Sequence, residues 1–417
     1  MKRIRIKGGN KLTGTIRISG AKNSAVALIP ASLLSDGVVK IDNIPDISDI
    51  ESLNEILEYL GAKVTRDGDV MEIDSSCIEN KPIPEEISAK LRASYYFMSS
   101  LLGKYKKVEM YFPGGCSIGK RPINLHLKGF EALGAKVKEK NNKFIITADR
   151  LVGTQIYLDF ASVGATINLM LAATKAEGTT IIENAAKEPH IVNVATFLNN
   201  MGAKITGAGT DQIKIVGVDK LGSCFHEVVP DYIETGTYMI IASAMGKNIK
   251  ITNAIPDHVE ALTLKLREMG ISVKTGPDYI EISRGSNLKP VNIKTQVYPG
   301  FPTDLQQPFA TLLTQCKGKS SINETIWENR FMNLSELKKM GATTTFKSSK
   351  GYITGPTKLN GTEVTATDLR AGAGLIVAGL IAEGITIISD VEHILRGYEQ
   401  IIQKLTEVGA KIELIQI

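Results

Sequence analysis

The stretch Leu60-Gly61-Ala62-Lys63-Val64 decides the fold, because the chain repeats it five more times. The other copies are Leu133-Gly134-Ala135-Lys136-Val137, Met201-Gly202-Ala203-Lys204-Ile205, Met269-Gly270-Ile271-Ser272-Val273, Met340-Gly341-Ala342-Thr343-Thr344 and Val408-Gly409-Ala410-Lys411-Ile412. Their glycines lie 68 to 73 residues apart. A fixed period of this kind is the signature of a repeated supersecondary unit. The sequence therefore predicts six related units, best grouped as three and three.

Each copy predicts the same local structure. Apolar residues at helical spacing precede it, such as Leu53, Leu57 and Leu60. The glycine suits the left-handed position that follows a helix, and the next residues favour a strand. A second glycine, which also lies between an apolar helical stretch and a strand-like run, precedes each copy: Gly37, Gly103, Gly178, Gly246, Gly318 and Gly384. One unit therefore reads as βαβαββ.

The sixth unit stops at Ile417, before its last strand. The N-terminal residues Ile4-Arg5-Ile6 and Thr15-Ile16-Arg17-Ile18 are strand-like and can supply the missing part. We therefore expect residues 1–20 to pack with the C-terminal half of the chain, which makes one domain discontinuous.

Composition excludes several classes of protein. The chain has 417 residues, 43% hydrophobic and 22% charged, with a net charge of +5, which excludes a disordered chain. The basic start lacks the apolar stretch of a signal peptide, and the apolar run from Gly374 to Ile381 is too short to span a bilayer. The four cysteines and five histidines show no metal-ligand or disulfide spacing. We expect a cytoplasmic protein with no metal, no cofactor, no nucleic-acid partner and no membrane insertion. The sequence identifies no protein partner.

One loop breaks the repeat. The two glycines of a unit are 31 residues apart in the second unit, against 23 to 25 in the others. The extra residues lie in the segment 112–122, which holds three glycines, Cys116, Lys120 and Arg121. Cations beside an exposed cysteine tune its reactivity, and loops carry functional sites on rigid scaffolds. The alternative is a mobile surface loop with an incidental cysteine. Cys77, Cys224 and Cys316 occupy ordinary repeat positions and read as core or surface residues.

Cations at the starts of helices form a second pattern. Lys22-Asn23, Arg92 and Arg370 open equivalent helices of units one, two and six. Three further arginines lie in or beside loops: Arg121, Arg330 and Arg396. Arginine binds phosphate and carboxylate groups bidentately, and helix N-termini add N–H donors. Each residue alone fits a surface ion pair, but together they favour one anion site.

Asp304 follows Phe301-Pro302-Thr303, just before the predicted helix of unit five. Two interpretations stay open for its carboxylate. It can act as a helix N-cap, or as a general base held near a substrate hydroxyl.

These segments together resemble the UDP-N-acetylglucosamine 1-carboxyvinyltransferase family of the enolpyruvyl transferases. The similarity runs from about residue 2 to residue 415 and rests on Ala21-Lys22-Asn23, Pro113-Gly114-Gly115-Cys116-Ser117-Ile118-Gly119, Phe301-Pro302-Thr303-Asp304, Glu328-Asn329-Arg330-Phe331-Met332 and Ala366-Thr367-Asp368-Leu369-Arg370-Ala371. The resemblance implies an inside-out α/β barrel of two domains, each with three βαβαββ repeats. The domains would be residues 21–229, and residues 1–20 with 230–417, with the active site in the cleft between them.

The resemblance also implies a reaction, the first committed step of peptidoglycan precursor synthesis. The enolpyruvyl group of phosphoenolpyruvate moves to the 3′-hydroxyl of UDP-N-acetylglucosamine, and phosphate is released. Cys116 would be the general acid, and could also form a covalent adduct with phosphoenolpyruvate, while Asp304 would take the proton of the sugar hydroxyl. The remaining roles belong to cations. Lys22, Arg121 and Arg396 would hold phosphoenolpyruvate, and Arg92, Arg330 and Arg370 would be supporting cations of the cleft.

The nucleotide sugar would contact a further set: Asn23, Arg121, Pro122, Ile123, Asn124, Leu125, Phe160, Ala161, Ser162, Val163, Gly164, Asp304 and Ile326. Phe160 departs from the family pattern, because many members carry Lys there. The loop at 112–122 is expected to close when the nucleotide sugar binds.

Two alternatives remain. One is enolpyruvyl transfer to shikimate 3-phosphate, against which the cysteine loop argues. The other is a relative that binds UDP-N-acetylglucosamine without turnover, against which the presence of both Cys116 and Asp304 argues.

Overall fold

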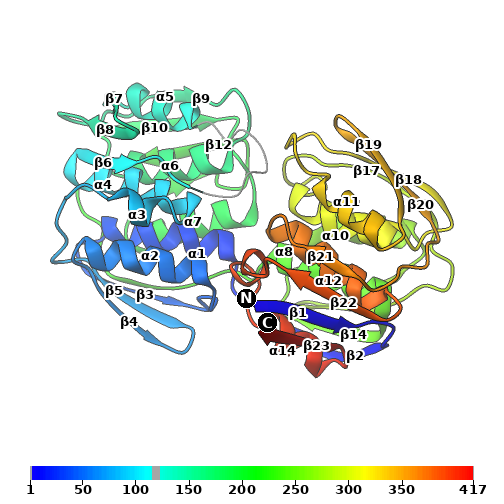
Figure 1. Ribbon diagram of the computed structural model, residues 1–417. Helices are drawn as coiled ribbons and strands as arrows, with labels where there is room; N and C mark the ends of the chain where they lie inside the picture. Colours follow the sequence, from blue (N-terminus) through cyan, green and yellow to red (C-terminus); the bar gives the residue numbers. More distant parts are fainter. Residues whose placement is uncertain (1, 115–122, 417) are drawn as a thin grey trace. The chain divides into compact units, whose positions relative to one another are not determined.

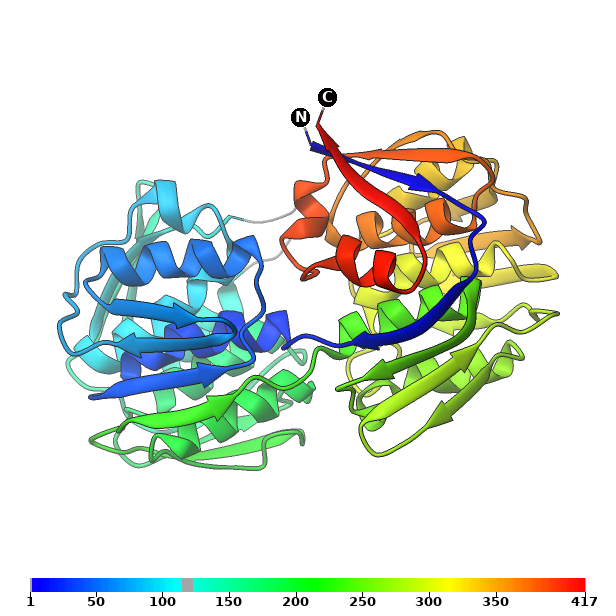
Figure 2. The ribbon, with the colours of Figure 1, turned by 90° about the horizontal axis from the view of Figure 1, so that it is seen from below.

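The computed structural model describes residues 2–114 and 123–416. Their contacts divide them into two compact units, shown from two directions in Figures 1 and 2. The first unit comprises residues 20–114 and 123–229, and the second comprises residues 2–19 and 230–416. The strands of the described residues form six sheets, three in each unit.

The first unit contains three sheets with the orders β13-β3-β5-β4, β6-β8-β7 and β9-β10-β12-β11. Their strands are β3 (Val38–Asp42), β4 (Lys63–Asp67), β5 (Val70–Asp74), β6 (Lys107–Tyr111), β7 (Lys136–Lys140), β8 (Lys143–Thr147), β9 (Gln155–Tyr157), β10 (Thr179–Glu183), β11 (Lys204–Thr206), β12 (Gln212–Val216) and β13 (Cys224–Glu227). The last strand, β13, runs parallel to the first, β3, with His226 opposite Ile41. This unit is therefore closed by its own two ends.

The second unit contains three sheets with the orders β2-β14-β16-β15, β17-β18-β20-β19 and β21-β22-β1-β23. Their strands are β1 (Lys2–Lys7), β2 (Leu12–Arg17), β14 (Gly246–Thr252), β15 (Ser272–Thr275), β16 (Tyr279–Ser283), β17 (Asn292–Lys294), β18 (Gly318–Asn323), β19 (Thr343–Lys347), β20 (Lys350–Gly355), β21 (Glu363–Thr365), β22 (Ile385–Ser389) and β23 (Lys411–Gln416). Strand β1 pairs antiparallel with both neighbours, with Ile4 opposite Ile388 and Leu414. Strand β2 runs parallel to β14.

Helices fill the inside of each unit, and the sheets cover them (Figure 1). The central helices are buried almost along their whole length: α1 (Lys22–Ala31), α4 (Tyr96–Tyr105), α6 (Val163–Ala173), α8 (Tyr232–Met245), α10 (Thr303–Leu313) and α12 (Leu369–Ile381). A helix that is apolar on all sides is stable only within a core, which explains this position. Each unit is thus an inside-out α/β barrel of three βαβαββ repeats.

The remaining helices are amphipathic or short. The α-helices are α2 (Ser48–Tyr59), α3 (Glu85–Ser88), α5 (Asn124–Ala132), α7 (Pro189–Asn200), α9 (Glu260–Glu268), α11 (Met332–Lys339), α13 (Glu392–Leu395) and α14 (Ile401–Glu407). The 3-10 helices are η1 (Ser32–Leu34), η2 (Arg92–Tyr95) and η3 (Pro256–Val259). Among the described residues, none of the helices combines the length and apolar character that crossing a membrane requires.

The repeat glycines have the predicted conformation. All six, from Gly61 to Gly409, have φ between +89° and +107° and follow a helix. Glycine adopts this left-handed conformation without the steric cost that a side chain imposes. The sequence prediction of six helix ends at these positions is confirmed.

Candidate functional site

The N-terminus of α1 presents the first two predicted residues, Lys22 and Asn23. The Lys22 Nζ atom lies 2.6 Å from Asp49 Oδ2, and the two side chains are 13% and 5% exposed. A buried carboxylate therefore fixes the position of the ammonium group and balances part of its charge.

The loop before α6 presents the residues predicted to bind the nucleotide sugar. Ser162 is the N-cap of α6, and its hydroxyl accepts a hydrogen bond from the Ala165 N–H at 3.3 Å. The first N–H groups of a helix have no partner within the helix and favour an anion such as a diphosphate. Phe160 is 56% exposed two residues earlier, where it offers an aromatic ring in place of the family's Lys.

Three predicted segments of the first unit meet at Tyr95. A Cβ atom on Gly164 would lie 2.7 Å from Tyr95 Oη and 2.9 Å from His126 Cε1, so only glycine fits without displacing its neighbours. The Arg92 guanidinium lies 5.8 Å from the centre of the Tyr95 ring. The His126 Nδ1 atom is 2.8 Å from Asn168 Nδ2, which joins α5 to α6. We call Arg92, Tyr95, Tyr96, His126 and Gly164 the Tyr95 cluster.

Burial controls the charges of this cluster. The pKa of His126 falls to about 3, mainly because the ring is buried and secondarily because Arg92 is near. Burial also lowers the pKa of Arg92. At neutral pH the cluster therefore holds an uncharged histidine beside a partly desolvated arginine, which strengthens the electrostatic interactions of that arginine.

In the second unit, two buried arginines bind Asp304. Arg330 donates a hydrogen bond to Asp304 Oδ1, and Arg370 Nη2 donates one to Oδ2 at 3.0 Å. Arg330 is 2% exposed and Arg370 is 5% exposed. Asp304 is the second residue of α10, whose N-cap is Pro302 without a side-chain cap bond. The N-cap interpretation of Asp304 is therefore wrong, and its carboxylate accepts hydrogen bonds from the two arginines instead.

A chain of hydrogen bonds fixes Arg370. Its Nη1 atom donates to Tyr398 Oη at 3.0 Å, and Tyr398 Oη lies 2.9 Å from Thr237 Oγ1. Asp368 caps α12 by accepting from two first-turn N–H groups, including that of Arg370 at 2.8 Å. Burial acts against the charge of Arg370, but the interactions with Tyr398 and then Asp304 outweigh it and raise its pKa. Arg370 is therefore a fixed cation at neutral pH.

The other predicted residues lie in further segments. Ile326 follows β18, and its N–H donates to Glu324 Oε1 at 2.8 Å. Arg396 is half-buried directly after α13. Ile123, Asn124 and Leu125 form the start of α5, where Leu125 is buried and Asn124 is exposed. Three predicted residues lie outside the described residues: Cys116, Arg121 and Pro122.

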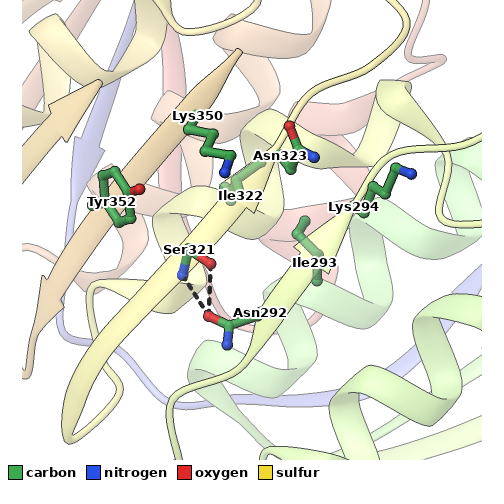
Figure 3. Close-up of a pocket in the computed structure, with 8 residues that line it drawn as sticks. All are labelled: Asn292, Ile293, Lys294, Ser321, Ile322, Asn323, Lys350 and Tyr352. Atoms are coloured by element: carbon green, nitrogen blue, oxygen red, sulfur yellow. Dashed lines mark hydrogen bonds between the residues drawn. The ribbon is translucent and has the colours of Figure 1, made fainter. Parts of the chain in front are cut away.

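A hollow of about 290 Å³ lies elsewhere, on the outer face of the β17-β18-β20-β19 sheet (Figure 3). There the Asn292 side-chain oxygen accepts hydrogen bonds from the Ser321 N–H and hydroxyl. The lining residues are Asn292, Ile293, Lys294, Ser321, Ile322, Asn323, Lys350 and Tyr352. No residue predicted to bind substrate lines this hollow. In the two described stretches, no group of three or more His, Cys, Asp or Glu side chains could hold a metal ion.

The sequence did not identify Tyr95 and His126. The three-residue spacing of Arg92 and Tyr95 could have indicated a stacked pair, but their contacts with α5 and α6 join segments far apart in the chain.

Residues 6–405 match the family described as EPSP synthase (3-phosphoshikimate 1-carboxyvinyltransferase). UDP-N-acetylglucosamine 1-carboxyvinyltransferase 2 of Geobacillus kaustophilus is 53% identical over 412 residues, which cover 99% of this chain and 96% of the relative. The protein of the same name from Bacillus subtilis is also 53% identical, with the same coverage of both chains. The chain belongs to the enolpyruvyl transferases, and among them to the UDP-N-acetylglucosamine 1-carboxyvinyltransferase family.

Solved structures of enolpyruvyl transferases share the fold. NikO from Streptomyces tendae has a TM-score of 0.90 at 27% identity, covering 100% of this chain and 99% of that one. EPSP synthase from Acinetobacter baumannii has a TM-score of 0.77 at 18% identity, covering 100% of both chains, and shows the fold alone.

Proposed function

We propose that this protein transfers the enolpyruvyl group of phosphoenolpyruvate to the 3′-hydroxyl of UDP-N-acetylglucosamine and releases phosphate. The names of the 53% identical relatives support UDP-N-acetylglucosamine as the acceptor of a carboxyvinyl group. The observation that carries the chemistry is the Asp304 carboxylate, held by Arg330 and Arg370. Two cations keep a carboxylate ionised, and an ionised carboxylate can accept the proton of a sugar hydroxyl.

The proposed reaction needs an acid and a base. Cys116 donates a proton to C3 of phosphoenolpyruvate, which makes C2 electrophilic. The sugar oxygen attacks C2 as Asp304 accepts its proton. The resulting tetrahedral intermediate then loses a C3 proton and phosphate, which restores the double bond in the product. The proton lost from C3 returns to the Cys116 thiolate, and the hydroxyl proton that Asp304 accepted leaves with the phosphate as hydrogen phosphate. No cofactor or metal enters this balance.

The cations bind the anionic groups of phosphoenolpyruvate in this proposal. Lys22, Arg121 and Arg396 hold its phosphate and carboxylate, and Arg92, Arg330 and Arg370 are supporting cations of the active site. Bidentate guanidinium groups orient both anions and stabilise the charge that develops on the departing phosphate. Lys22 approaches this task already oriented by Asp49.

In this proposal the nucleotide sugar binds at the N-terminus of α6, where its diphosphate accepts hydrogen bonds from the N–H groups that follow Ser162. Asn23, the stretch 121–125, Asp304 and Ile326 provide the remaining contacts. Phe160 replaces a charge contact by an aromatic one. The two units act as the two domains of the enzyme, and the reaction is the first committed step of peptidoglycan synthesis in the cytoplasm.

The two alternatives lack comparable support. Transfer to shikimate 3-phosphate is favoured only by the broad family match, whereas the 53% identical relatives carry the other name. Binding without turnover does not explain why both Cys116 and Asp304 are present.

Phosphate release tests the proposal. The protein is incubated with both substrates, and Cys116→Ala serves as the control. We expect phosphate release that requires both substrates and that stops in the control. Cys116→Asp retains an acid, so it should keep some turnover while losing alkylation at this thiol. A wild-type rate no higher than that of Cys116→Ala would rule out the proposed function.

A further inference from the structure

Tyr95 lies over Arg92 for a local reason. The two residues are the first and last of η2, three positions apart. A 3-10 helix has three residues per turn, so side chains at i and i+3 lie above one another. The 5.8 Å between the guanidinium carbon and the ring centre is a cation–π distance. The aromatic ring therefore limits where the Arg92 guanidinium can lie.

Two further rings hold Tyr95 in place. The His126 ring meets it edge to face at 4.9 Å and 69°, and the Tyr96 ring does so at 4.6 Å and 72°. These are favoured aromatic geometries. Both supporting residues are only 4% exposed, so they belong to the rigid core of the unit.

Gly164 packs against the same ring from α6. The 2.7 Å between its hypothetical Cβ atom and Tyr95 Oη shows that the backbone of α6 approaches the ring as closely as glycine allows. Gly164 is the second residue of α6, so this contact lies at the helix end that we propose for the diphosphate. The Tyr95 ring thus separates a cation from a helix N-terminus by a fixed distance.

We propose that Tyr95 is a positioning residue for the nucleotide sugar, which sets the guanidinium of Arg92 relative to the N-terminus of α6. This inference rests on the proposed function. Tyr95 acts through Arg92 and Gly164. Gly164 belongs to the loop proposed to bind the nucleotide sugar, and Arg92 is a supporting cation of the site. Loss of Tyr95 should therefore affect nucleotide-sugar binding more than phosphoenolpyruvate binding.

The test uses three variants: Tyr95→Leu, Tyr95→Phe and Tyr105→Leu. Tyr105 is the matched control, because it is half-buried at the end of the neighbouring helix α4 and donates to the Ile78 carbonyl oxygen at 3.1 Å. Tyr95→Leu should raise KM for UDP-N-acetylglucosamine about 2- to 30-fold, the range of a lost cation–π interaction. We expect kcat and KM for phosphoenolpyruvate to change by less than about twofold, the lower end of that range.

Two comparisons separate positioning from general stability. Tyr95→Phe keeps the ring and should retain a near-normal KM for the nucleotide sugar. Tyr105→Leu should lower Tm and leave that KM unchanged. The inference fails if Tyr95→Phe loses as much affinity as Tyr95→Leu, or if KM for both substrates rises together. Tyr95→Met, whose long side chain fills more of the space without a ring, replaces Tyr95→Leu if that variant does not fold.

Calorimetric titration of UDP-N-acetylglucosamine without phosphoenolpyruvate distinguishes this inference from the proposed function. If the wild type binds the nucleotide sugar and releases no phosphate, the proposed reaction is wrong while the change in Kd still decides the role of Tyr95. Equal Kd values for wild type and Tyr95→Leu overturn the inference even if the enzyme turns over. A wild type that does not bind the nucleotide sugar overturns both.

Discussion

Asp304 should stabilise the protein in addition to its proposed role as the base, because it carries the charge opposite two buried arginines. A hydrogen bond to a charged group contributes about 1.5–3 kcal/mol. Asp304→Asn leaves one acceptor oxygen for Arg330 and Arg370, so one such bond is lost. Breaking a fully buried ion pair costs about 3–5 kcal/mol, but Asp304 is 29% exposed, so water can solvate part of the unpaired charge and the cost is smaller. We expect a loss of about 1.5–3 kcal/mol.

Differential scanning calorimetry measures this loss. For a unit of this size, 1 kcal/mol corresponds to about 2–4 °C, so the transition should fall by roughly 3–12 °C. Glu383→Gln is the matched control, because Glu383 forms a 2.7 Å pair with Lys358 in the same unit while both side chains are about two-thirds exposed. Exposed pairs contribute little, so its Tm should barely move.

A second variant identifies the cause. Asp304→Asn combined with Arg330→Met removes one of the two buried cations, and the double variant should be less destabilised than the sum of the single variants. The reasoning would be refuted if Asp304→Asn shifted Tm no more than Glu383→Gln, or if the two substitutions were simply additive.

Three further predictions concern stability. Burial lowers the pKa of His126 to about 3, so the unfolded state binds a proton first and the free energy of unfolding falls as pH drops below 6.5. Between pH 7 and pH 4.5, urea titrations should show that His126→Gln loses roughly 2–3 kcal/mol less unfolding free energy than the wild type, and equal losses would contradict this. Gly217→Ala should lower the free energy of unfolding by at least about 2 kcal/mol, because its Cβ would lie 1.6 Å from a backbone oxygen. Gly222→Ala, whose Cβ would have its nearest neighbour at 3.9 Å, should unfold at the same urea concentration as the wild type, and similar urea midpoints for the two variants would refute the prediction. Lys347 lies directly opposite Lys350 on the neighbouring strand, so Lys347→Glu replaces a like-charge pair by an opposite-charge pair and should raise the free energy of unfolding by about 0.2–1 kcal/mol at low salt. A gain that persists in 1 M NaCl would show that charge is not the cause.

Most of the fold was predictable from the repeat, because each unit needs a glycine at the end of a helix and this need depends only on neighbouring residues. Glycines such as Gly61 and Gly134 occupy a backbone conformation that other residues avoid, so their spacing is visible in the sequence. The closure of the first unit by β13 was not predicted. Cys224–Glu227 looks like any strand after a turn, and its parallel partner β3 lies far away in the sequence.

Only those site residues that belong to recognisable sequence motifs could be predicted. Arg330 and Arg370 were expected among the cations of one anion site, but their pairing with the Asp304 carboxylate was not predicted. The N-cap interpretation of Asp304 failed because a cap residue needs a non-helical backbone, whereas α10 already begins at Thr303. Tyr95 was missed because its contacts with α5 and α6 join segments far apart in the chain, which its local spacing from Arg92 does not reveal.

The place of β1 constrains how the protein is made. The ribosome produces residues 2–7 well before residues 385–416, yet this strand lies between β22 and β23 and pairs with residues 385–388 and 411–416. The first unit, in contrast, has all its described strands once Glu227 has emerged. Synthesis therefore imposes an order, in which the first unit closes early while β1 remains unpaired until β22 and β23 have been made. Its alternation of Ile4 and Ile6 with basic residues keeps a waiting strand charged on one face, which discourages premature pairing with other chains.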